Sequence, residues 1–79
     1  MNRNTKPAVP ALEKALSILE YIARQGRFIN PKEIAEELGV PIATTYRIMK
    51  YLSNRSYLQE SPQGGAYALG AQLLHLAKR

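Results

Sequence analysis

The side chains best suited to chemistry in this chain are basic and polar groups between positions 42 and 55. The guanidinium of Arg47 can hydrogen-bond guanine O6 and N7 together, and Lys50 and Arg55 can hold phosphates. Tyr46 can offer its hydroxyl to a base edge or a phosphate. Alternatively, Arg47 contacts a phosphate or forms a surface ion pair, and Tyr46 is a half-buried aromatic residue with a packing role. The chemistry these residue types favour is recognition of nucleic acid.

Helical spacing places these groups on one surface. The outward face of a helix over 41–54 comprises Ile42, Ala43, Tyr46, Arg47 and Lys50. Its buried face comprises Thr45, Ile48, Met49 and Leu52. Thr44 flanks the outward face and can donate to a phosphate. Ile42 and Ala43 can contact thymine methyl groups, although a plain surface position is nearly as good an interpretation.

The preceding residues supply the other half of a helix-turn-helix. A helix over 31–38 starts well, with Asn30 as the N-terminal cap and Pro31 at the first helical position. Ala35 falls where the two helix axes come closest. Gly39 falls in the turn, where the backbone needs a positive φ. This arrangement presents the second helix for entry into the major groove of B-DNA.

The remaining segments predict a further helix on each side of the motif and a hairpin. An apolar helical stripe at Leu12, Ala15, Leu16, Leu19, Ile22 and Ala23 predicts a helix over 11–25. Residues 27–29 are suited to a short edge strand. Strands over 57–60 and 66–69 flank a glycine-rich turn at 61–65, and a short apolar helix over 71–78 follows.

This order is that of a winged helix-turn-helix: mainly α with a small β-hairpin, comprising a three-helix core, a wing and a C-terminal helix. We expect a flexible N-terminal arm over 1–10 and the folded domain over 11–70. Arg3 and Lys6 of the arm can reach an adjacent groove, with plain disorder as the alternative. In the wing, Gln63 and Gly64 can present an amide or a backbone N–H to phosphate, and a simple turn is the alternative.

Composition supports a polyanionic partner and argues against other classes of function. The 79 residues carry a formal charge of +5, and the pI is about 9.8. Cysteine and aspartate are absent and there is one histidine, so neither a catalytic constellation nor a metal site is expected. We expect no cofactor, no enzymatic activity, no membrane segment and a cytoplasmic location.

The chain resembles the N-terminal DNA-binding domain of IclR-type bacterial transcription regulators. The resemblance rests on ALEKALSILEYIA, EIAEELGVPIATTYRIMKYL and YALGAQLLHLA. It implies sequence-specific binding of double-stranded DNA by a homodimer on a palindromic operator. It also implies a small-molecule effector bound by a C-terminal domain not included here, with 71–79 as the start of the linker helix. We therefore expect a part of a longer regulator, with a naturally short relative as the alternative.

Several positions depart from the family's usual pattern. Ile42 and Ala43 replace a basic residue and a serine, Ser56 replaces a glycine, and Ala68 replaces an arginine. No lysine or arginine occurs over 56–77, so the wing is not expected to be a strong electrostatic clamp. If Ser56 adopts a left-handed conformation, it carries a small strain.

The last helix requires a partner because it is so apolar. Leu73, Leu74 and Leu76 can pack on their own domain, cover Leu12 and Leu16, or meet a second protomer. We favour a mixture in which the first and last helices form the dimer contact. The rival function is a winged helix that binds proteins without touching DNA.

Overall fold

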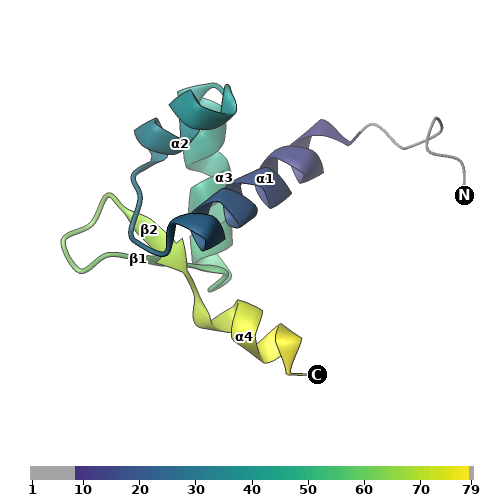
Figure 1. Cartoon of the computed structure of the whole chain (residues 1–79), viewed down its shortest axis with the longest axis vertical. Coiled ribbons are helices and arrows are strands. Elements are labelled where there is room, and N and C mark those ends of the chain that lie inside the picture. The colour runs from purple at the N-terminus through teal and green to yellow at the C-terminus, as the bar shows by residue number, and fades with distance from the viewer. Residues whose placement is uncertain (1–8, 79) are drawn as a thin grey trace, which may run out of the picture.

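The computed structural model describes residues 9–78, which fold into four helices and one hairpin (Figure 1). The elements are α1 (Pro10–Gln25), α2 (Pro31–Leu38), α3 (Ile42–Asn54), β1 (Leu58–Glu60), β2 (Tyr67–Leu69) and α4 (Ala71–Ala77). The expected winged helix-turn-helix is confirmed. Helix α1 begins at Pro10, the last residue of the expected arm, and residues 1–8 of that arm lie outside the described residues. Proline suits the first helical turn because its missing N–H would be unpaired there.

Local signals in the sequence determine the ends of the first two helices. Gly26 ends α1 with φ +63° and Gly39 ends α2 with φ +67°, both in the left-handed region. The Asn30 side chain accepts a 2.8 Å hydrogen bond from the Glu33 N–H, which caps α2 as expected. Ala35 is one of the two buried residues of α2. The turn and cap expectations are confirmed.

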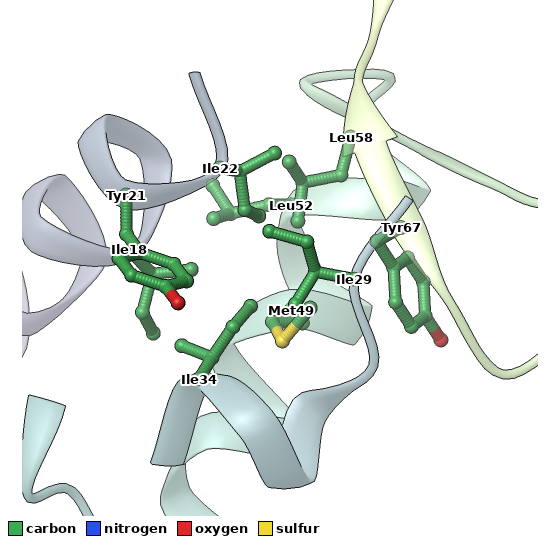
Figure 2. Close-up of a cluster of buried hydrophobic side chains, with 9 residues drawn as sticks. All are labelled: Ile18, Tyr21, Ile22, Ile29, Ile34, Met49, Leu52, Leu58 and Tyr67. Carbon is green, nitrogen blue, oxygen red and sulfur yellow. The ribbon is translucent and has the colours of Figure 1, made fainter. Parts of the chain in front are cut away.

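The core lies where α1, α2, α3 and the hairpin meet (Figure 2). Its buried apolar side chains are Ile18, Tyr21, Ile22, Ile29, Ile34, Met49, Leu52, Leu58 and Tyr67. Thr45 is also fully buried, and its hydroxyl donates to the Pro41 carbonyl oxygen at 3.1 Å. The expected buried face of α3 is therefore confirmed at Thr45, Met49 and Leu52, whereas Ile48 is only partly buried.

The helix expected over 11–25 is confirmed as α1, but the apolar stripe that predicted it lies only partly in the core. Helix α1 buries Ile18, Tyr21 and Ile22, whereas Leu12 and Leu16 are 55% and 48% exposed. The helix carries two apolar faces, and periodicity alone cannot show which one the rest of the domain covers. The exposed face requires another explanation.

The hairpin is antiparallel and extends to a third segment. Leu58 pairs with Leu69, Gln59 with Ala68, and Glu60 with Tyr67. Ile29 and Tyr67 exchange backbone hydrogen bonds of 2.9 and 2.8 Å. The edge strand expected over 27–29 is thus reduced to one bridge. It joins the loop after α1 to the base of the wing.

Helix α4 extends from the hairpin away from the three-helix body (Figure 1). Its start is held by hydrogen bonds from Gly70 N–H to Tyr57 O at 2.9 Å and from Gln72 N–H to Ser56 O at 3.0 Å. The helix buries no residue, and Leu74 remains 59% exposed. Because Leu12 and Leu16 are also exposed, α4 does not cover them within one chain.

Candidate nucleic-acid interface

One face of α3 projects from the domain and carries the side chains singled out by the spacing. Ile42 and Tyr46 are 52% and 49% exposed, and Ala43 and Arg47 are also exposed. Lys50 and Thr44 are half-buried. Burial of Thr45, Met49 and Leu52 on the opposite side determines this orientation, because rotating α3 would expose the core.

The two cations of this face lie on different flanks of α3. Arg47 borders an open apolar groove together with Leu12 and Ala15 of α1. Lys50 lies on the other side, close enough to Tyr67 of the hairpin to lower the pKa of its phenol, against larger opposing effects. The helix therefore presents one positive charge toward α1 and another toward the wing.

Arg55 is placed differently from the other basic residues of this segment. It is the C-terminal cap of α3, and its guanidinium carbon lies 5.7 Å from the centre of the Tyr51 ring. Tyr51 lines the same groove as Arg47. Arg55 is thus on the α1 side at the far end of α3, away from Ile42 and Ala43.

The tip of the wing uses its own backbone donors. The Gly64 N–H donates to Ser61 O at 2.8 Å, and the Gly65 N–H donates to Oε2 of Glu60 at 3.0 Å. The Ser61 hydroxyl adds a bond to Gly64 O at 3.2 Å. These bonds hold the turn and leave the exposed Gln63 side chain as its free polar group. A contact from the Gly64 or Gly65 N–H would have to replace an existing bond.

Two groups near α3 were not singled out from the sequence. Tyr67 fits an inward-facing strand position, so alternation assigns it to the core alone. Glu60 is its cross-strand partner and places a carboxylate beside the wing. The register of the hairpin pairs Glu60 with Tyr67. Neither residue type by itself suggested a role near α3.

The remaining expectations concern other parts of the chain. Arg3 and Lys6 lie outside the described residues. His75 is exposed on α4, and within residues 9–78 no group of His, Cys, Asp or Glu has the geometry to hold a metal ion. In the same range no helix has the length and apolar character needed to cross a bilayer.

Charge is segregated between the two helices of the motif. Helix α2 carries Glu33, Glu36 and Glu37 against Lys32, whereas the 41–60 segment carries Arg47, Lys50 and Arg55 against Glu60. The projecting helix is thus basic and the helix behind it acidic. This arrangement suits a polyanion that approaches α3.

Comparison with known proteins identifies the class. The profile of the IclR helix-turn-helix domain matches residues 11–62. The chain therefore belongs to this family of helix-turn-helix domains.

Individual relatives agree with this membership. The chain is 32% identical over 68 residues to the glycerol operon regulatory protein of Streptomyces griseus, covering 86% of this chain and 27% of that protein. It is 32% identical over 60 residues to the transcriptional repressor AllR of Salmonella typhimurium, covering 76% of this chain and 22% of that protein. An IclR transcriptional regulator from Alicyclobacillus acidocaldarius superimposes with a TM-score of 0.85 and 32% identity, covering 92% of this chain and 30% of that structure. The chain thus spans less than a third of each.

Proposed function

We propose that this chain binds double-stranded DNA as the DNA-binding domain of a transcription regulator. Helix α3 enters the major groove, which is about 12 Å wide and admits an α-helix. The observation that carries the proposal is the projecting face of α3, on which small apolar groups and cations lie side by side with acidic α2 behind them. Relatives named as operon regulators or repressors support it, and we place the protein in the cytoplasm.

Each exposed group then has a role that its chemistry allows. Arg47 reads a guanine through two hydrogen bonds, and Ile42 and Ala43 pack against thymine methyl groups. Tyr46 donates to a base edge or a phosphate. The groups assigned to the sugar–phosphate backbone are Thr44, Lys50, Arg55, Gln63, Gly64 and, from the arm, Arg3 and Lys6.

The domain acts as a homodimer on a palindromic operator. One helix in one major groove makes few contacts, and a second copy spaced by whole turns of DNA doubles them. The exposed leucines Leu12 and Leu16 of α1 and Leu74 and Leu76 of α4 support a protein contact at these helices. A small-molecule effector acts through a C-terminal domain beyond this chain, and the regulator represses transcription, as the name of AllR says of that protein.

Fluorescence anisotropy with random-sequence duplex DNA at low and moderate salt, combined with in-vitro selection of preferred sites, tests the proposal. Salt-dependent binding and a selected two-fold-symmetric site are expected. Binding without any selected sequence would contradict the specific role of α3. Absence of binding at low salt would overturn DNA recognition and favour a winged helix that binds proteins.

A further inference from the structure

Gly70 lies where the end of the hairpin passes close to the loop that follows α3. Its φ is −100° and its ψ is 171°, an extended conformation that any residue can adopt. A methyl group at this position would overlap the carbonyl oxygen of Ser56 and lie 3.1 Å from the carbonyl carbon of Leu58. Both neighbours are backbone atoms, which cannot swing aside as a flexible side chain can. Glycine is therefore required here for space and not for backbone freedom.

Backbone hydrogen bonds connect this close approach to both α3 and α4. On the α3 side, the Tyr57 N–H donates to Leu52 O at 2.9 Å, in the last turn of the helix. On the α4 side, the carbonyl oxygens of Ser56 and Tyr57 accept the bonds from Gln72 and Gly70 described above. We call Ser56, Tyr57, Gly70 and Gln72 the α3–α4 junction.

The α3–α4 junction determines the direction in which α4 leaves the domain. Helix α4 buries no residue and leads away from the three-helix body (Figure 1), so packing contributes little to the direction of its axis. In the described part of the chain no further hydrogen bond attaches α4 to another element. The axis of α4 is therefore held relative to α3, because the junction continues the last turn of that helix.

The apolar side chains of α4 and of the groove between α1 and α3 lack cover within one chain. Leu74 and Leu76 of α4 are 59% and 50% exposed. The groove is lined by Leu12 and Ala15 of α1 and Tyr51 of α3, among others, and Tyr51 is 61% exposed. Helix α4 and the N-terminal half of α1 extend on the same side in Figure 1, opposite the tip of the hairpin. In a two-fold dimer, α4 of each copy can cover the groove of the other, so the same contact is made twice.

We propose that the α3–α4 junction sets the distance between the two α3 helices of the homodimer, with Gly70 as the positioning residue. The inference rests on the proposed DNA binding and homodimer, and it adds the spacing of operator half-sites as a property that Gly70 controls. One base pair moves a half-site by about 3.4 Å along the duplex and about 35° around it. A rigid junction therefore fits a narrow range of spacings. Where the geometry does not fit, the gain from the second half-site is lost.

Two variants and one control test this role. Gly70→Ala forces the start of α4 away from the Ser56 carbonyl. Insertion of one alanine between Gln72 and Leu73 leaves the junction intact and turns the rest of α4 by about 100°. Gly26→Ala is the control, because its φ of +63° strains an L-residue while the added methyl group meets no atom within 4 Å. The control thus lowers stability without touching α4.

Affinity is measured by fluorescence anisotropy on duplexes with one selected half-site, or with two inverted half-sites whose spacing changes by one base pair at a time. The unaltered protein should bind the best spacing at least about tenfold more tightly than spacings two base pairs away. Gly70→Ala and the insertion should each reduce this preference to about twofold or less, with affinity for a single half-site changed by less than about twofold. Gly26→Ala should unfold at a lower urea concentration and keep the spacing preference.

An unchanged spacing preference in Gly70→Ala or in the insertion variant would overturn the inference. Equal losses on single and paired half-sites in Gly70→Ala would show a purely structural role for Gly70. If Gly70→Ala does not fold, the insertion variant decides, since it alters no buried residue. Binding of single half-sites by the unaltered protein without any preferred spacing would overturn the inference and leave DNA recognition by α3 standing. Absence of DNA binding at low salt would instead defeat the proposed function itself.

Discussion

The hydroxyl of Tyr21 on α1 donates a 3.1 Å hydrogen bond to Oε2 of Glu33 on α2. The same carboxylate oxygen pairs with the guanidinium of Arg27 at 2.6 Å. Glu33 is three residues after the Asn30 cap, which is the position from which a capping-box side chain turns back to the cap. Instead, Glu33 joins α1, the following loop and α2, and Asn30 caps the helix by itself.

This cluster makes stability depend on pH. The hydrogen bond from Arg27, and to a smaller extent that from Tyr21, hold the pKa of Glu33 below its usual value. A carboxyl with a lowered folded-state pKa stabilises the fold above its unfolded pKa of about 4.3, and the effect is lost as the pH falls through the folded value. Glu33→Gln should therefore be less stable than the unaltered protein at pH 7, and the gap should close as the pH falls below the unfolded pKa and through the lowered folded pKa of Glu33.

Urea unfolding at a series of pH values measures this gap. Glu36→Gln is the matched control, because Glu36 is exposed on the same helix and makes no side-chain hydrogen bond or ion pair within the described part of the chain. An equal loss at acid and neutral pH in Glu33→Gln would rule out the charged form as the source of stability.

Arg47 and Lys50 should differ in what they contribute to DNA binding. Arg47→Ala is expected to relax the preference at one base pair by about 1–3 kcal/mol, since a bidentate contact to guanine is lost. Lys50→Ala should weaken binding to all sequences alike and lower the salt slope by about one unit. Anisotropy on selected and random duplexes separates the two effects. Similar losses on every sequence from both variants would refute this division.

Removing the charge of Glu60 should strengthen DNA binding. Its carboxylate lies on the wing, where it repels DNA phosphates, and the amide oxygen of Glu60→Gln can still accept from the Gly65 N–H. We expect affinity to rise about two- to fivefold at low salt and the gain to shrink at high salt. Glu20→Gln, exposed on α1, controls for net charge alone. An equal gain in both variants would remove any specific role for Glu60.

The exposed apolar face of α1 should support dimerisation. Leu16→Glu places a charge on that face, and because Leu16 is 48% exposed the monomer should still fold. The dimer dissociation constant should rise by at least about tenfold, since burying an unpaired charge is costly. Sedimentation equilibrium measures it, with Ser17→Glu, exposed on the same helix, as the control. Unchanged association of Leu16→Glu would exclude this face from the interface.

Replacing Ser56 with glycine should stabilise the fold. Its φ is +67°, a left-handed conformation that costs an L-residue roughly 1–2 kcal/mol. Glycine avoids this cost, but it loses more conformational entropy on folding, which offsets part of the gain in stability. Ser56→Gly should raise the unfolding free energy by about 0.5–1 kcal/mol. Ser53→Gly inside α3 should lower it by a similar amount. Urea denaturation measures both, and a destabilised Ser56→Gly would show that the strain is absent.

Much of the fold was readable from local sequence. Asn30 and Pro31 start α2, Gly26 and Gly39 end helices, and the spacing of Thr45, Met49 and Leu52 orients α3. Each of these signals acts within about one or two helical turns, so it needs no knowledge of distant residues. The outward face of α3 followed from the same spacing.

The tertiary structure decided which of several residues suited to the core become buried. Helix α1 has two apolar faces, and only packing against α2, α3 and β2 selects Ile18 and Ile22 over Leu12 and Leu16. Tyr67 suits the core by strand alternation, but only the tertiary structure pairs its backbone with Ile29 and so joins β2 to the loop after α1. Sequence alone determined the elements and their faces because these depend on near neighbours. Their mutual positions depend on contacts between distant segments, which local patterns do not encode.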